Sequence, residues 1–132
     1  YYASNVVANL IQKIVEDNDR ESRRKDFFIF DTPHVYPDTL QNFDKNQFLI
    51  IFLGYMDCIP MEKVDEIRHH DCDSCWTKRL SEVELLRQVE ESIEYSRDIK
   101  EQCNKQGFVY FDVSHDMMEV LKSANDYIFH HI

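Results

Sequence analysis

Three short apolar runs, each stopped by an aspartate or a glycine, restrict the fold of this chain more than any other feature of its sequence. They are 27–30 (FFIF), 48–55 (FLIIFLGY) and 108–113 (FVYFDV). None of them alternates apolar with polar residues, and each is short for a buried helix. Such runs are typical of strands that are buried on both faces, as in a parallel sheet. The sequence therefore predicts three buried strands.

Helical periodicity fills most of the chain between these runs. From 2 to 17 the apolar residues recur three and four positions apart, as do those of 61–70, where Pro60 suits the first helical position. The strongest pattern begins at Ser81, which forms a capping-box sequence with Glu84, and it stops at Gly107. One face of this predicted helix carries Leu85, Val89, Ile93, Ser96, Ile99 and Cys103.

Two polar stretches are predicted to be loops. The charged stretch 17–26 (DNDRESRRKD) is typical of a solvated turn, and the prolines of 31–38 (DTPHVYPD) oppose both a regular helix and a central strand. After the last apolar run, Ser114 or Asp116 is expected to cap a final helix that continues to about residue 128.

Strands that alternate with helices predict parallel pairing through right-handed crossovers. We therefore expect one α/β domain over residues 1–132, with a three-layer parallel sheet between flanking helices. Three strands make a narrow sheet, so this fold looks incomplete, with room for strands supplied from elsewhere.

The charge balance limits the partners that this chain can attract. Its 25 acidic and 15 basic residues give a formal net charge of -10, which argues against a broad electrostatic grip on nucleic acid or on an anionic membrane. Lys78 and Arg79 form a local basic patch that suits a few phosphates. No apolar window is long enough for a membrane span, and we expect four reduced cysteines in a cytoplasmic protein.

Three segments together resemble the small P-loop kinases, the group that contains adenylate and shikimate kinases. They are the apolar run with its proline loop (IFDTPHVYPDTL), the second run with its basic connection (FLIIFLGYMD, then RHHDCDSCWTKRLSEVEL), and the closing segment GFVYFDVSHDMMEVLKSANDYI. The order of these segments is similar to the distal part of that fold and covers nearly the whole chain. The resemblance implies ATP and Mg²⁺ as cofactors and a small-molecule acceptor as substrate.

The motif that defines the family is missing from these 132 residues. A phosphate-binding loop reads G-x-x-x-x-G-K-[ST], and neither Gly54 nor Gly107 begins one. We expect the first strand and that loop to lie upstream of Tyr1, and we expect this chain alone to be inactive.

Asp31 follows the first apolar run, at what would be the carboxyl edge of a sheet, where open α/β folds bind ligands. The resemblance implies that it holds Mg²⁺ through water or positions the acceptor, with Thr32 and His34 close enough to contribute. The alternative is a loop acid that caps its own turn.

A lid-like helical segment at about 60–80 carries the predicted phosphate ligands Arg68, Lys78 and Arg79. In the resembling kinases this connection closes over the phosphates, and guanidinium groups match phosphate geometry. The alternative is a basic surface that balances an acidic protein. We expect Trp76 to anchor the packing rather than to stack on a base.

A cluster of two histidines and two cysteines, His69, His70, Cys72 and Cys75, leaves three interpretations open. Thiolates and imidazoles bind Zn²⁺ tetrahedrally, but four ligands this close in sequence would strain the tetrahedron. The other two interpretations are a Cys72–Cys75 disulfide and a reduced surface loop, of which we expect the loop.

Ser114 and His115 follow the last run, where the resembling kinases place the nucleotide base. The alternative, which we expect, is a helix cap. If the chain is complete as it stands, the alternative function is a non-catalytic interaction module that pairs with a partner or forms a homodimer. A small structural-zinc protein is the third hypothesis.

Overall fold

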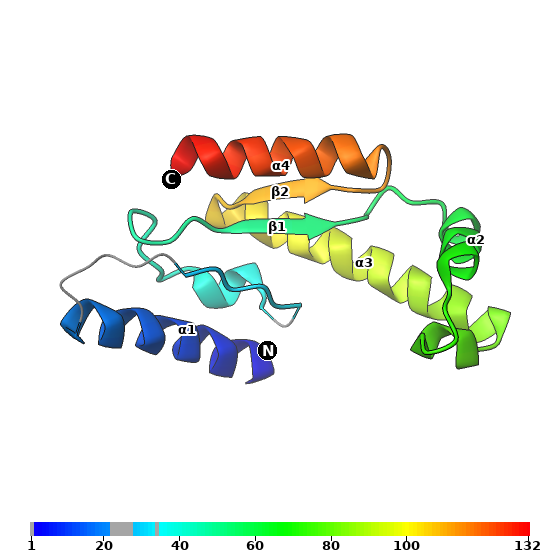
Figure 1. Ribbon diagram of the computed structural model, residues 1–132, viewed down its shortest axis with the longest axis horizontal. Coiled ribbons are helices and arrows are strands. Elements are labelled where there is room, and N and C mark those ends of the chain that lie inside the picture. Colours follow the sequence, from blue (N-terminus) through cyan, green and yellow to red (C-terminus); the bar gives the residue numbers. More distant parts are fainter. Residues whose placement is uncertain (1, 22–27, 34) are drawn as a thin grey trace. The chain divides into compact units, whose positions relative to one another are not determined.

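The computed structural model describes residues 2–21, 28–33 and 35–132, and it divides into two compact units. Unit 1 is Tyr1–Phe48 and unit 2 is Leu49–Ile132, and each is described by itself (Figure 1). The expectation of a single domain stays a prediction. Among the described helices, none combines the length and the apolar character that a membrane crossing needs.

Unit 1 consists of helix α1 (Tyr2–Glu21) and a 3-10 helix, η1 (Pro37–Leu40), that lies beside it. α1 runs four residues beyond the predicted end at 17, so the start of the charged stretch is helical, whereas 22–26 lie outside the described residues. The buried apolar residues of this unit come from α1, from η1 and from the residues on either side of η1: Ala8, Ile11, Val35, Pro37, Leu40 and Phe43.

A closed set of hydrogen bonds joins the two elements of unit 1. The Ser4 hydroxyl, which is almost fully buried, accepts the backbone N–H of Tyr36 (2.8 Å) and lies 2.7 Å from the Thr39 hydroxyl. The Thr39 hydroxyl in turn donates to the carbonyl of Tyr36 (2.7 Å). Each buried hydroxyl therefore has a partner, which removes the cost of placing it away from water.

The predicted strand at 27–30 is wrong for the part that the structure describes. Residues 28–30 are not in a strand, Ile29 is 95% exposed, and residue 27 lies outside the described residues. A run of this composition needs neighbouring strands on which to pair and bury its side chains, and in unit 1 the described residues offer none.

Unit 2 is built on two parallel strands, β1 (Ile51–Gly54) and β2 (Val109–Asp112), which pair in the register Ile51 with Val109. Between them the chain forms α2 (Pro60–His70), the 3-10 helix η2 (Trp76–Arg79) and α3 (Glu82–Gln106). After β2 comes α4 (Met117–His131). The structure thus confirms the parallel pairing of the second and third predicted runs.

α3 begins and ends where the sequence predicts. Ser81 accepts the N–H of Glu84, and the Glu84 carboxylate accepts the N–H of Ser81, which completes the capping box. Gly107 ends the helix with φ 69°, a left-handed conformation that costs glycine little. All six residues predicted to share a face are buried.

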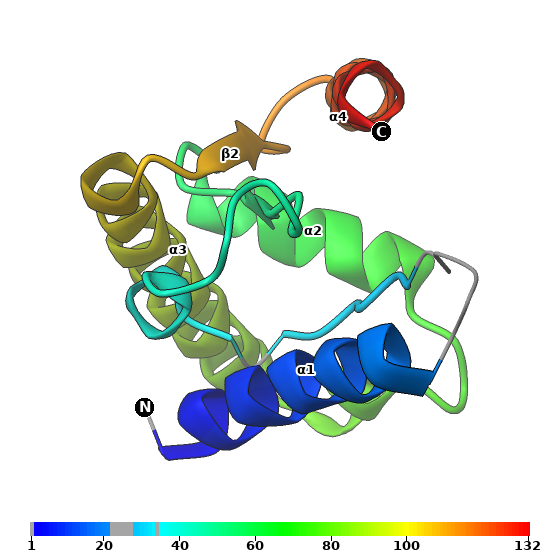
Figure 2. The same ribbon diagram turned by 90° about the vertical axis from the view of Figure 1, so that its left-hand side faces the viewer.

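The two faces of the small sheet are covered by different helices. Tyr110 of β2 points toward α3, where Lys100 lies over its ring, whereas Phe111 meets Tyr127 of α4. Figures 1 and 2 show β2 between α3 on one side and α4 on the other. A hydrophobic cluster lies at the N-terminal half of α3, where Leu85, Val89 and Ile93 pack with Val64 of α2.

The predicted fold class, a three-layer parallel sheet with flanking helices, is wrong for this structure. Helices dominate the described residues, and the sheet has only two strands of four residues each. The sequence prediction counted the run at 27–30 as a strand, and without that strand the sheet never reaches the width that a layered fold needs.

Candidate functional site

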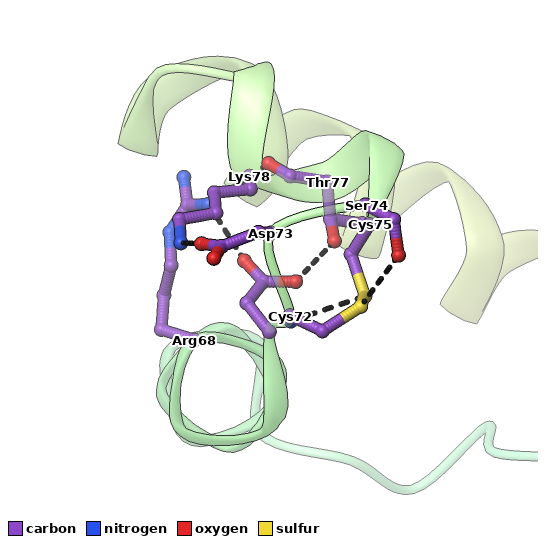
Figure 3. Close-up of a disulfide and its surroundings, with 8 residues drawn as sticks. Arg68, Cys72, Asp73, Ser74, Cys75, Thr77 and Lys78 are labelled. Carbon is purple, nitrogen blue, oxygen red and sulfur yellow. Dashed lines mark hydrogen bonds and ion pairs between the residues drawn. A yellow bond between two sulfur atoms is a disulfide. The ribbon is translucent and has the colours of Figure 1, made fainter.

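The last turn of α2 and the connection that follows it, residues 71–81, together carry most of the side chains that the sequence marked for function, and Figure 3 shows several of them. Arg68, in the last turn of α2, organises the connection. Its guanidinium donates to the Asp71 carboxylate (3.1 Å), to the carbonyl of Thr77 (2.8 Å) and to the carbonyl of Leu80 (2.7 Å). One side chain therefore holds the start, the middle and the end of the connection.

Asp71 is the anionic partner of this arrangement. Its carboxylate also accepts the Thr77 hydroxyl. That hydrogen bond is the main reason why the pKa of Asp71 lies below its usual range, with further lowering by Arg68 and by the charge of Lys78, while partial burial opposes the shift. Asp71 is thus held as a carboxylate that secures the connection. Nothing in the sequence pattern distinguished it from other surface acids.

The basic residues of η2 lie at the exposed side of the connection. Lys78 forms an ion pair with Asp73, and both side chains are well exposed. Arg79 is exposed too and has no hydrogen-bond or ion-pair partner in the part of the chain that the structure describes. Trp76 is 61% exposed, so the expectation that it anchors the packing is wrong.

Cys72 and Cys75 are joined in a disulfide, with their Cα atoms 5.2 Å apart. The expectation of a reduced loop is therefore wrong at this pair. Cys58 and Cys103 are free thiols. The rings of His69 and His70 lie edge to face with centroids 5.0 Å apart, at the end of α2. The described residues contain no cluster of three or more histidine, cysteine or acidic side chains suited to a metal ion.

A second group of polar contacts lies at the carboxyl ends of β1 and β2. The Asp112 carboxylate accepts the N–H groups of Ser114 (2.8 Å) and Met56 (3.1 Å), and the Ser114 hydroxyl accepts the N–H of Asp57 (2.9 Å). The two turns that leave the sheet are thereby tied to each other. His115 is exposed beside them.

The sequence analysis missed Asp112, although a signal for it existed. Asp112 ends an apolar run in the same way as Asp31 does, and only Asp31 was considered a site residue. Ser114 is predicted to contact a nucleotide. In the structure its hydroxyl accepts the N–H of Asp57 and its own N–H donates to Asp112, so both groups take part in the link between the two turns. Nucleotide binding by Ser114 and His115 stays a prediction.

On the α3 side of the sheet, three polar groups are buried near one another: the Tyr110 hydroxyl, the Ser96 hydroxyl and the Cys103 thiol. The Tyr110 hydroxyl is fully buried beside Ser96 and has no hydrogen-bond partner of normal geometry among the described residues. Burial, with the charge of Asp112, raises the pKa of Tyr110 to about 12. Burial likewise raises the pKa of Cys103 to about 12, although the positive charge of Lys100 lowers it in part. Neither group ionises near neutral pH, so neither suits a nucleophile or a base.

The remaining predicted residues belong to unit 1. Asp31 is exposed in a loop and does not end a strand, Thr32 is half-buried, and His34 lies outside the described residues. The roles given to these residues in Mg²⁺ or acceptor binding stay predictions.

A shallow polar cleft of about 350 Å³ lies between α1 and the segment that begins with η1. Its lining includes five carboxamides, from Asn5, Asn9, Gln12, Gln41 and Asn42, and none of the residues predicted to form a site.

Comparisons with known proteins add no relative. No protein-family model matches the chain, and neither a curated protein nor a solved structure is significantly similar to it.

Proposed function

We propose that unit 2 is the distal part of an ATP-dependent small-molecule phosphotransferase, in which the connection between α2 and α3 contributes a phosphate ligand. The observation that carries this proposal is Arg79, an exposed arginine without a partner in the described chain, in a protein with a net charge of -10. Most other basic side chains of unit 2 have acidic neighbours available, so an unpaired guanidinium is well suited to a phosphate.

The Arg68 network supports the same proposal. Because Arg68 holds Asp71, Thr77 and Leu80, the backbone around Arg79 is ordered before a ligand arrives. Preorganisation of this kind lowers the entropic cost of binding. Arg68 itself directs its hydrogen bonds into the protein, so we assign it the support of the connection and Arg79, with Lys78 beside it, the phosphate contact.

The parallel strands support the proposal more broadly. β1 and β2 end at a common edge, where Asp112 and Ser114 tie the turns, and ligands of open α/β sheets bind at such edges. ATP with Mg²⁺ would require a phosphate-binding loop outside these 132 residues. A cytoplasmic location, where ATP is abundant, belongs to the same proposal.

The test uses the natural full-length protein. Binding of MgATP is measured by calorimetry, and ADP release is followed with a panel of small hydroxyl and carboxylate acceptors. Arg79→Ala is expected to lower kcat/KM about tenfold or more, the effect of losing one charged phosphate contact. Arg87→Ala is the matched control, because Arg87 is an exposed arginine of the same unit that pairs with Glu91. The proposal fails if the protein has no affinity for millimolar ATP, or if the two variants behave alike.

A second candidate, a non-catalytic interaction module, is favoured by the apolar exposure of α4. Ala124 is its only buried residue, whereas Met118 and Phe129 are 75% and 67% exposed. Sedimentation analysis distinguishes this function: a stable dimer or complex that is indifferent to ATP would support it and contradict the kinase proposal.

A further inference from the structure

We propose that Cys72 and Cys75 form a redox-active pair that exchanges with dithiol compounds, with Cys72 as the sulfur that is attacked. The two cysteines close a turn on the exposed connection between α2 and α3, and no comparison assigns them a role. This inference does not depend on nucleotide binding.

The accessibility of the two sulfurs differs. Cys72 is exposed, whereas Cys75 is only partly so. An incoming thiolate therefore reaches Cys72 Sγ more readily. The backbone N–H of Cys72 lies 3.1 Å from Cys75 Sγ and donates to it, which stabilises negative charge on the sulfur that leaves. Figure 3 shows the pair beside Ser74 in the turn between α2 and η2.

The balanced exchange has two steps. A thiolate of the dithiol attacks Cys72 Sγ, so that a bond forms between them as the Cys72–Cys75 bond breaks, and Cys75 leaves as a thiolate that takes a proton from water. The second thiol of the reagent, deprotonated, then attacks the reagent's own first sulfur and releases Cys72. Two electrons pass to the protein, and the dithiol becomes a disulfide. The Ser74 hydroxyl, 3.3 Å from Cys72 Sγ, can donate to the released thiolate.

The surrounding contacts make the exchange reversible. The N–H of Cys75 donates to the carbonyl of Cys72 (3.0 Å), and Arg68 fixes the chain on both sides of the turn. Reduction therefore leaves the two thiols close together, and a high effective concentration favours their rejoining. The flanking acids do not dominate the charge at the pair, because Asp71 is paired with Arg68 and Asp73 with Lys78.

The other two cysteines are poor competitors. Cys103 is fully buried, and its raised pKa leaves almost no thiolate at neutral pH. Cys58 is half-buried and packs against the core cluster of Val64 and Leu85. Exchange is thus confined to a single pair whose position is fixed by the fold.

The first experiment equilibrates the Cys58→Ser chain with mixtures of reduced and oxidised dithiothreitol, blocks free thiols with an alkylating reagent, and measures mass. We expect a single two-electron transition that runs in both directions, with Cys103 unmodified and helical circular dichroism unchanged. The proposal is overturned if the pair resists excess dithiothreitol while the chain is folded. It is also overturned if the reduced pair retains one equivalent of zinc and no longer reoxidises.

The second experiment tests which sulfur reacts. The oxidised Cys58→Ser chain is treated with reduced glutathione, the mixed disulfide is trapped by rapid acid quenching, and its position is found by peptide mass spectrometry. About tenfold more mixed disulfide is expected on Cys72 than on Cys75, because Cys72 is the more exposed sulfur and its N–H stabilises the Cys75 thiolate that leaves. Equal trapping on the two cysteines, or more on Cys75, would contradict the assignment.

Discussion

α3 and α4 flank the same strand, yet they differ in how completely the chain determines them. α3 has a capping box at its start, a left-handed glycine at its end and seven buried residues along one side. α4 starts at Asp116, whose φ of 48° is unusual for a residue other than glycine, without a side-chain cap, and it buries only Ala124. The α3 side of the sheet therefore carries the stable core of unit 2, and the α4 side leaves apolar surface exposed to solvent within this chain.

The strongest test of this comparison removes one leucine from each helix. Leu85 is 1% exposed within the core cluster, so Leu85→Ala is expected to cost about 2–5 kcal/mol of unfolding free energy through lost burial and a cavity. Leu121 of α4 is 37% exposed, and Leu121→Ala should cost about 1 kcal/mol or less. Urea unfolding of both variants decides the matter. Equal losses would show that α4 contributes as much to stability as α3.

The next test concerns the sheet face under α3. A Cβ at Gly54 would come within 2.2 Å of the Tyr110 hydroxyl, so Gly54→Ala should destabilise by about 1–3 kcal/mol. Tyr110→Phe removes a hydroxyl that has no partner among the described residues, and it should be nearly neutral.

The double variant Gly54→Ala with Tyr110→Phe should recover part of that loss, since the closest atom is gone while the ring carbon Cζ still lies 2.9 Å from the added Cβ. A double-mutant cycle by thermal unfolding measures the coupling. Leu53→Ala serves as control, because Leu53 is half exposed on the strand next to Gly54. Strict additivity of the two changes would refute close packing on this face.

The helix starts give a smaller effect. Ser81→Ala removes the hydroxyl that accepts the N–H of Glu84 and donates to its carboxylate, while the backbone N–H of residue 81 still donates to Glu84, and it should cost about 1 kcal/mol. Asp116→Gly should instead stabilise by up to about 1 kcal/mol, because glycine adopts a positive φ without strain. Denaturant titrations measure the change in unfolding free energy of each variant, and changes of opposite sign would sharpen the contrast between the two helices. A loss of stability in Asp116→Gly would remove the argument for strain.

The smallest effect is a pH dependence near the start of α3. The pKa values of Asp71 and Glu84 are lowered, chiefly by the hydroxyls of Thr77 and Ser81. A lowered pKa in the folded state means that the stabilisation is complete above the ordinary carboxyl range of about 4 and disappears as pH falls through the folded values. NMR titration of the two carboxyl groups checks this. Titration at or above ordinary values would contradict it, and Asp71→Asn with Glu84→Gln should abolish the dependence.

Local signals determined how much of this fold the sequence could predict. Ser81, Glu84 and Gly107 act through the hydrogen bonds and dihedral angles of their own neighbourhood, and the bounds of α3 were predicted correctly from them. Pro60 likewise indicated the start of α2, because proline suits the first position of a helix. The run at 27–30 was predicted wrongly, because an apolar run becomes a strand only when other strands are available beside it.

The candidate site was predictable in its location but not in its contacts. The basic residues and the cysteines marked the connection between α2 and α3, yet the sequence could not show that Arg68 would reach Thr77 and Leu80 across a turn. The pairing of Cys72 with Cys75 is likewise decided by the shape of that turn. Trp76 was misjudged, because burial depends on what the fold places beside a residue and not on its size alone.

The parallel pairing of β1 with β2 also has a kinetic consequence. Ile51 and Val109 are far apart along the chain, so joining the strands first would require closing a long loop at a large entropic cost. Formation of α2 and α3, packed through Val64 and Leu85, brings the strand ends together beforehand. The helical pair should therefore form in the folding nucleus and the sheet after it, so that substitutions in β2 accelerate unfolding more than they slow folding.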